Sequence, residues 1–175
     1  MNKHAIKSGI IIGVITIVIT LLMYLVDPTV MASMVAGLGI LAISLGLVAY
    51  FGIQYRNEEG GFMPFGKSWI YSMQAFVIAG LIGTIFRILL FNVIDPELST
   101  IVADAMIENQ ESMMSSFGMP EDQMEEALDK ARESTLDGFT PMGSIIGFLW
   151  FLIGYAIFSL ITGAIIKKNE PEVEI

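Results

Sequence analysis

The sequence contains no cysteine and a single histidine, His4, among its 175 residues. Without cysteine, a disulfide, a thiolate nucleophile and a cysteine-ligated metal site are all excluded. We expect His4, near the N-terminus, to be solvated or at the headgroups rather than a base, which leaves no Ser-His or Cys-His pair for nucleophilic catalysis. The composition therefore favours a protein that is not an enzyme, with no catalytic residue, no metal ligand and no cofactor.

Charged residues are also scarce, at 15% of the chain against about 25% in a typical soluble domain. Four apolar runs account for the difference, at residues 5–26, 30–53, 69–94 and 141–166. About 20 helical residues cross the hydrocarbon core of a bilayer, where the backbone must satisfy its own hydrogen bonds. The sequence predicts an all-α integral membrane protein with four transmembrane helices, forming one membrane domain over residues 1–175. We interpret the first run as a retained span because no small-x-small cleavage site precedes Asp27.

The few basic residues predict the orientation of the spans. Nine basic residues stand against eighteen acidic ones, for a net charge of −9, which argues against a nucleic-acid partner. Six of the nine flank the runs on one side: Lys3, Lys7, Arg56, Lys67, Lys167 and Lys168. By the positive-inside rule, we expect a multi-pass protein of the bacterial cytoplasmic (inner) membrane, with both termini and residues 54–68 cytoplasmic.

The segment at 95–138, between the third and fourth runs, carries twelve acidic residues and two basic ones. Asp95 and Pro96 are typical of a helix start, Phe117-Gly118 of a helix end, and Glu121-Asp122 of an acidic first turn. Apolar residues recur at helical spacing in both parts, which predicts an extracytoplasmic helical hairpin. Its apolar stripes could pack on each other or on the membrane lipid, or they could dock a protein partner. Metal binding is disfavoured because its carboxylates lack the pattern of a calcium loop.

The stretch from Gly61 to Ser68, GFMPFGKS, matches the spelling of a nucleotide-binding P-loop. Such a loop needs a preceding strand and backbone N–H groups that surround phosphate, whereas an apolar run precedes this stretch and Pro64 has no N–H. We therefore expect no nucleotide. Gly60 and Gly61 are predicted to form a tight turn, with Gly66 and Lys67 at a loop-to-span junction.

Several motifs resemble one bacterial membrane-protein family over nearly the whole chain. They are Ser8-Gly9 to Gly13, Gly52 to Arg56, Gly60-Gly61, Phe65-Gly66-Lys67, Phe117-Gly118, Glu125-Glu126 and Lys167-Lys168. These resemble the family called domain of unknown function 4199 (DUF4199). The resemblance implies a four-span integral membrane protein and supplies no established activity.

Arg87 is the one ionisable residue well inside a predicted span. A charge at mid-membrane costs at least about 2.5–3.5 kcal/mol and commonly marks a functional site. We expect its guanidinium to be packed or to reach the headgroups and to pair with Asp27, Asp95 or a lipid phosphate. Contact with a substrate or partner is the alternative.

Pairs of small residues at four-residue spacing recur in the runs and allow helices to approach closely. They are Gly9/Gly13, Ala42/Gly46, Ala75/Ala79/Gly83, Gly143/Gly147 and Ser159/Gly163. We expect most of them to pack the chain's own spans, with a homo-oligomer as the alternative. The sequence as a whole favours a protein that acts by association with a partner, with lipid or with itself. A small transporter or channel component acting as an oligomer is the alternative.

Overall fold

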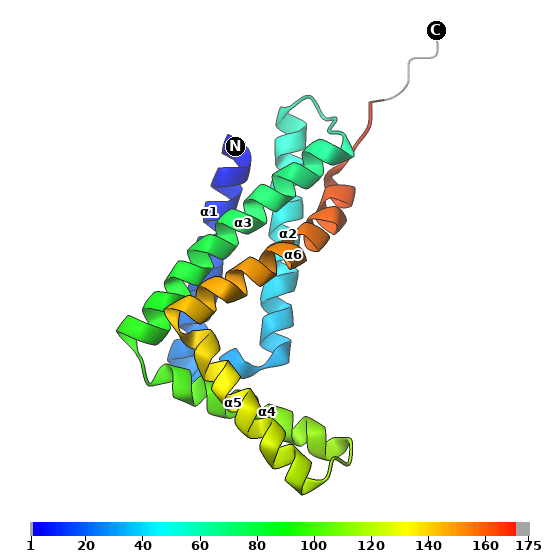
Figure 1. Ribbon diagram of the computed structural model, residues 1–175. Helices are drawn as coiled ribbons and strands as arrows, with labels where there is room; N and C mark the ends of the chain where they lie inside the picture. Colours follow the sequence, from blue (N-terminus) through cyan, green and yellow to red (C-terminus); the bar gives the residue numbers. More distant parts are fainter. Residues whose placement is uncertain (1, 171–175) are drawn as a thin grey trace. The chain divides into compact units, whose positions relative to one another are not determined.

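The computed structural model describes residues 2–170, and over that range the chain is helical with no β-strand (Figure 1). Six α-helices are joined by short turns, one 3-10 helix and one π-helix. In chain order they are α1 (Lys3–Val26), η1 (3-10, Pro28–Ala32), α2 (Met34–Glu58), α3 (Phe65–Leu89), η2 (π, Leu90–Ile94), α4 (Leu98–Ser116), α5 (Glu121–Phe139) and α6 (Pro141–Ile166).

Four of these helices are long and apolar enough to cross a membrane: α1, α2, α3 with η2, and α6. The four predicted runs correspond to them, with shifted ends. The second helix begins at Met34 rather than at residue 30, because Asp27 caps η1 by accepting a hydrogen bond from the Thr29 N–H. The third begins at Phe65, directly after Pro64, so the loop before it is shorter than predicted.

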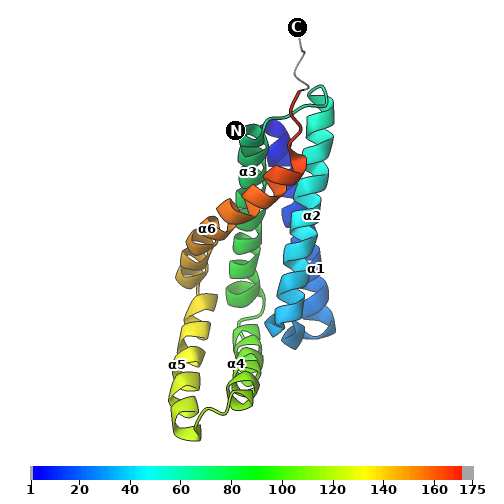
Figure 2. The same cartoon turned by 90° about the vertical axis from the view of Figure 1, so that its right-hand side faces the viewer.

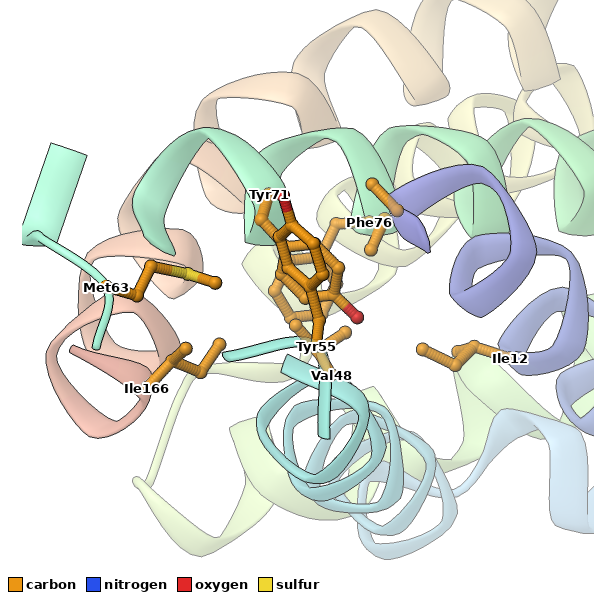
Figure 3. Close-up of a cluster of buried hydrophobic side chains, with 9 residues drawn as sticks. Ile12, Val48, Tyr55, Met63, Tyr71, Phe76 and Ile166 are labelled. Carbon is orange, nitrogen blue, oxygen red and sulfur yellow. The ribbon is translucent and has the colours of Figure 1, made fainter. Parts of the chain in front are cut away.

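The described part of the chain divides into two compact units, and unit 1 comprises residues 2–17, 40–83 and 148–170. Its buried core gathers side chains from α1, α2, α3 and α6. Figure 3 shows the rings of Tyr55 and Tyr71 stacked at its centre, with centroids 5.3 Å apart. The Tyr71 hydroxyl donates a hydrogen bond to Ser8 Oγ at 2.7 Å. Tyr55 also stacks on His4 at 4.6 Å, and His4 Nδ1 lies 3.3 Å from Glu58. His4 is nevertheless exposed, so these contacts do not remove it from solvent.

Only some of the small residues in unit 1 support close packing. A Cβ at Gly9 would lie 2.7 Å from Ile78 Cβ, and one at Gly13 would lie 3.0 Å from Ile82 Cβ. These two glycines therefore let α1 approach α3, as expected. Gly46 behaves differently, because a Cβ there would have no neighbour within 4 Å. The Ala42/Gly46 pair does not pack spans of this chain together.

Unit 2 comprises residues 18–39 and 84–147. Within it α4 and α5 run side by side as the two arms of a hairpin (Figure 2). Phe117 ends α4, and Gly118 has a φ of +72°, a left-handed conformation that glycine adopts without strain. Arg132 on α5 forms an ion pair with Asp104 on α4 at 2.6 Å. The predicted helical hairpin is confirmed.

Candidate functional site

Arg87 lies near the end of α3 and reaches the junction between α5 and α6. Its Nη2 donates a hydrogen bond to the Gly138 carbonyl oxygen at 3.2 Å. The guanidinium carbon lies 5.0 Å from the Phe139 ring centroid and 5.9 Å from that of Phe91. Because the two rings stack on each other at 4.5 Å, they form a fixed apolar support for the cation. The side chain itself is exposed.

A second polar side chain, Asn92 in η2, contacts the same junction. Its Nδ2 donates to the Phe139 carbonyl at 3.0 Å and to the Ile88 carbonyl at 3.1 Å. The Asn92 side chain thus connects η2 to the end of α5. Arg87 and Asn92 together supply hydrogen-bond donors to two carbonyls where α5 ends and α6 begins. These contacts add hydrogen bonds to backbone carbonyls at the break between the helices.

The two carboxylates that were expected to pair with Arg87 have other partners. Asp27 Oδ1 accepts hydrogen bonds from the N–H and the hydroxyl of Thr29, at 2.9 and 2.7 Å. These bonds, the one from the hydroxyl first, lower the pKa of the Asp27 carboxyl below its ordinary value. Asp95 accepts from the Tyr24 hydroxyl at 3.0 Å and from the Leu98 N–H at 3.3 Å. The structure therefore pairs neither Asp27 nor Asp95 with Arg87.

The glycine-rich stretch belongs to unit 1 and forms a turn between α2 and α3. Gly60 and Gly61 have φ values of +98° and +86°, so both need the freedom of glycine, and the predicted tight turn is confirmed. Gly66 lies in the first turn of α3, with open space where a Cβ would be. The neighbouring Lys67 donates to Glu59 Oε2 at 2.5 Å. That hydrogen bond lowers the pKa of the Glu59 carboxyl. The turn follows the helix α2, whereas a P-loop follows a strand.

The tip of the α4–α5 hairpin exposes apolar side chains. Phe117 is 82% exposed, Met113 57% and Met119 36%. Acidic residues lie on either side of them in the chain, with Glu111 before and Glu121 and Asp122 after, and all three are exposed. Among the described residues no group of three or more carboxylate or histidine side chains lies close enough to hold a metal ion.

The sequence reasoning missed Phe139, the residue that completes the surroundings of Arg87. Phe139 is 7% exposed and belongs to a core cluster with Leu90, Phe91, Leu98, Val102 and Ala103. In the sequence it stands between Gly138 and Thr140-Pro141, a composition typical of a loop. An aromatic residue just before a predicted span was the one available signal.

Comparison with known proteins identifies a family and no characterised relative. A family model described as "Protein of unknown function (DUF4199)" matches residues 7–168. No curated protein and no solved structure matches the chain. The four apolar helices indicate a membrane protein, in agreement with the expectation from the sequence motifs. Because the match covers nearly its whole length, the chain belongs to the DUF4199 family.

Proposed function

We propose that this membrane protein is not an enzyme and that it acts by association, with the α4–α5 hairpin as the docking element for a protein partner. In this proposal both termini lie in the cytoplasm and the hairpin faces the opposite side of a bacterial inner membrane. The six basic residues that flank the spans on the side of the termini support this orientation.

The observation that carries the proposal is the exposure of Phe117 at the hairpin tip. Phe117 lies outside all four membrane-spanning candidates, and in this proposal a partner protein covers its exposed ring. Interface residues that contribute most to affinity are commonly aromatic and are surrounded by less critical contacts. Phe117, with Met113 and Met119 beside it in the chain, offers such an anchor.

The charge of the hairpin indicates which kind of partner it fits. Residues 95–138 carry a net charge of −10, from twelve acidic and two basic residues. Such a segment is repelled by an anionic membrane surface and attracts a basic one, which raises the rate of encounter. We therefore propose a partner with a basic surface around an apolar pocket.

Site-specific cross-linking tests this proposal. A photo-crosslinker is attached in intact cells to a single cysteine, Glu125→Cys, and the adducts are identified by mass spectrometry. We expect a discrete protein adduct that is lost when Phe117→Ser is added, because removal of an aromatic anchor weakens binding by about 30-fold. The matched control is Ile101→Ser, which changes another exposed apolar residue on the same arm and should keep the adduct.

Adducts formed only with lipid or with a second copy of the chain would contradict docking to a partner protein. An adduct equally abundant with Phe117→Ser would show that the hairpin tip is not the anchor. The purified partner is then measured against both variants, and its affinity for the Ile101→Ser protein should equal that for the unchanged chain.

A further inference from the structure

The guanidinium of Arg87 extends to the end of the membrane-spanning region. Arg87 belongs to α3, yet its Nη2 contacts the carbonyl of Gly138, and Gly138 precedes the first residue of α6, Pro141. The apolar run of the last span begins only at that proline. The side chain therefore carries its charge from within one span to the level where another begins, which is the level of lipid headgroups.

Among the described residues no carboxylate forms an ion pair with this cation. Within residues 2–170 the ion pairs are His4–Glu58, Lys67–Glu59, Lys130–Glu126 and Arg132–Asp104. Asp27 and Asp95 are engaged elsewhere. The Gly138 carbonyl is the one hydrogen-bond acceptor that Arg87 has among the described residues, whereas a guanidinium offers about five N–H donors. The remaining donors of a cation at the edge of the bilayer are available to an anion.

The surroundings of Arg87 hold the guanidinium in place for such an anion. Phe139 is nearly fully buried and stacked on Phe91, so the support beneath the cation does not move freely. Gly138 is fixed in turn, because its carbonyl also accepts a hydrogen bond from the Ser144 hydroxyl at 3.3 Å. The planar fork of arginine matches two oxygens of a phosphate better than the point charge of lysine does.

We propose that Arg87 binds the phosphate of a phospholipid in the leaflet on the side of the hairpin. A lipid is favoured over free phosphate, because a lipid headgroup is already present at this depth and its acyl chains add apolar contacts. The first turns of α6 offer apolar surface for an acyl chain, with Met142 66%, Ile145 46% and Ile146 48% exposed. This site is independent of docking at the hairpin tip.

Lipid binding to the purified full-length protein in a phosphate-free detergent tests the proposal. The probe is phosphatidylglycerol, and the amount retained per protein molecule is measured by native mass spectrometry over a titration. We expect Arg87→Gln to weaken binding by about tenfold, the effect of losing a charge-assisted hydrogen bond. Arg87→Lys should bind with intermediate affinity. The matched control, Arg132→Gln, removes an arginine that is paired with Asp104 and should bind as the unchanged protein does.

Two further ligands keep the test decisive if Arg87→Gln does not fold. Diacylglycerol, which has the acyl chains and no phosphate, should bind the unchanged protein at least about tenfold more weakly than phosphatidylglycerol. Inorganic phosphate should not displace the lipid at the same concentration. Equal binding of diacylglycerol, or wild-type affinity in Arg87→Gln, would overturn the proposal. Full displacement by inorganic phosphate would overturn the lipid as the ligand.

Discussion

Replacing Phe139 with alanine is expected to destabilise the protein by about 3 kcal/mol, the lower end of the range for truncating a buried phenylalanine. Phe139 is buried in the core of unit 2, in one cluster with Leu90, Leu98 and Val102. Its ring also stacks on Phe91 and lies under the guanidinium of Arg87. The substitution would therefore create a cavity and remove two specific ring contacts.

The loss is measured as the free energy of unfolding in detergent micelles, relative to the unchanged protein. Phe117→Ala is the matched control, since it makes the same chemical change in the same unit at a side chain that is 82% exposed. Substitutions at exposed positions typically change the free energy of unfolding by less than about 0.5 kcal/mol. If both variants lost the same free energy, the cluster around Phe139 would not be a core.

Replacing Gly143 with alanine is expected to cost about 2 kcal/mol net. A Cβ at this position would overlap the backbone carbonyl oxygen of Asp137. That oxygen cannot easily move, because it accepts hydrogen bonds from the Thr140 N–H at 3.1 Å and the Thr140 hydroxyl at 2.6 Å. Relief of the overlap would break this turn at a cost of about 3 kcal/mol, of which the better helix propensity of alanine recovers about 1 kcal/mol.

Gly147→Ala is the matched control for this prediction. Gly147 lies one turn later in the same helix, and a Cβ there would have no neighbour within 4 Å. We expect this variant to gain about 0.5–1 kcal/mol from helix propensity alone. The two alanine variants should thus differ in sign when their unfolding is compared under one condition. A stabilising effect of Gly143→Ala would contradict the tight junction between α5 and α6.

The sequence predicted the helices of this protein better than their contacts. Hydropathy and length indicate the four apolar helices, and Gly118 and the Gly60-Gly61 pair indicate turns, because these signals are local. The partner of Arg87 depends instead on which groups meet in three dimensions. Asp95 is engaged by Tyr24, 71 residues away in the chain, and that pairing left no pattern in the sequence.

The sequence also could not show which pairs of small residues pack helices of this chain together. Gly9 and Gly46 stand in equivalent four-residue patterns, yet only Gly9 faces another helix of the chain at close range. Spacing shows that close approach is allowed, and it does not show which helix approaches. The transporter alternative stays a prediction, as does the absence of catalytic activity.

The topology that we propose puts the hairpin on the opposite side of the membrane from both ends of the chain. Because the sequence has no cysteine, single cysteines can report it directly. Glu125→Cys in the hairpin, Glu58→Cys at the end of α2 and Asn169→Cys after α6 are treated in intact cells with a membrane-impermeant maleimide. We expect Glu125→Cys to be labelled at once, and the other two cysteines to be labelled only after the membrane is permeabilised. Labelling of all three positions from one side would contradict this topology.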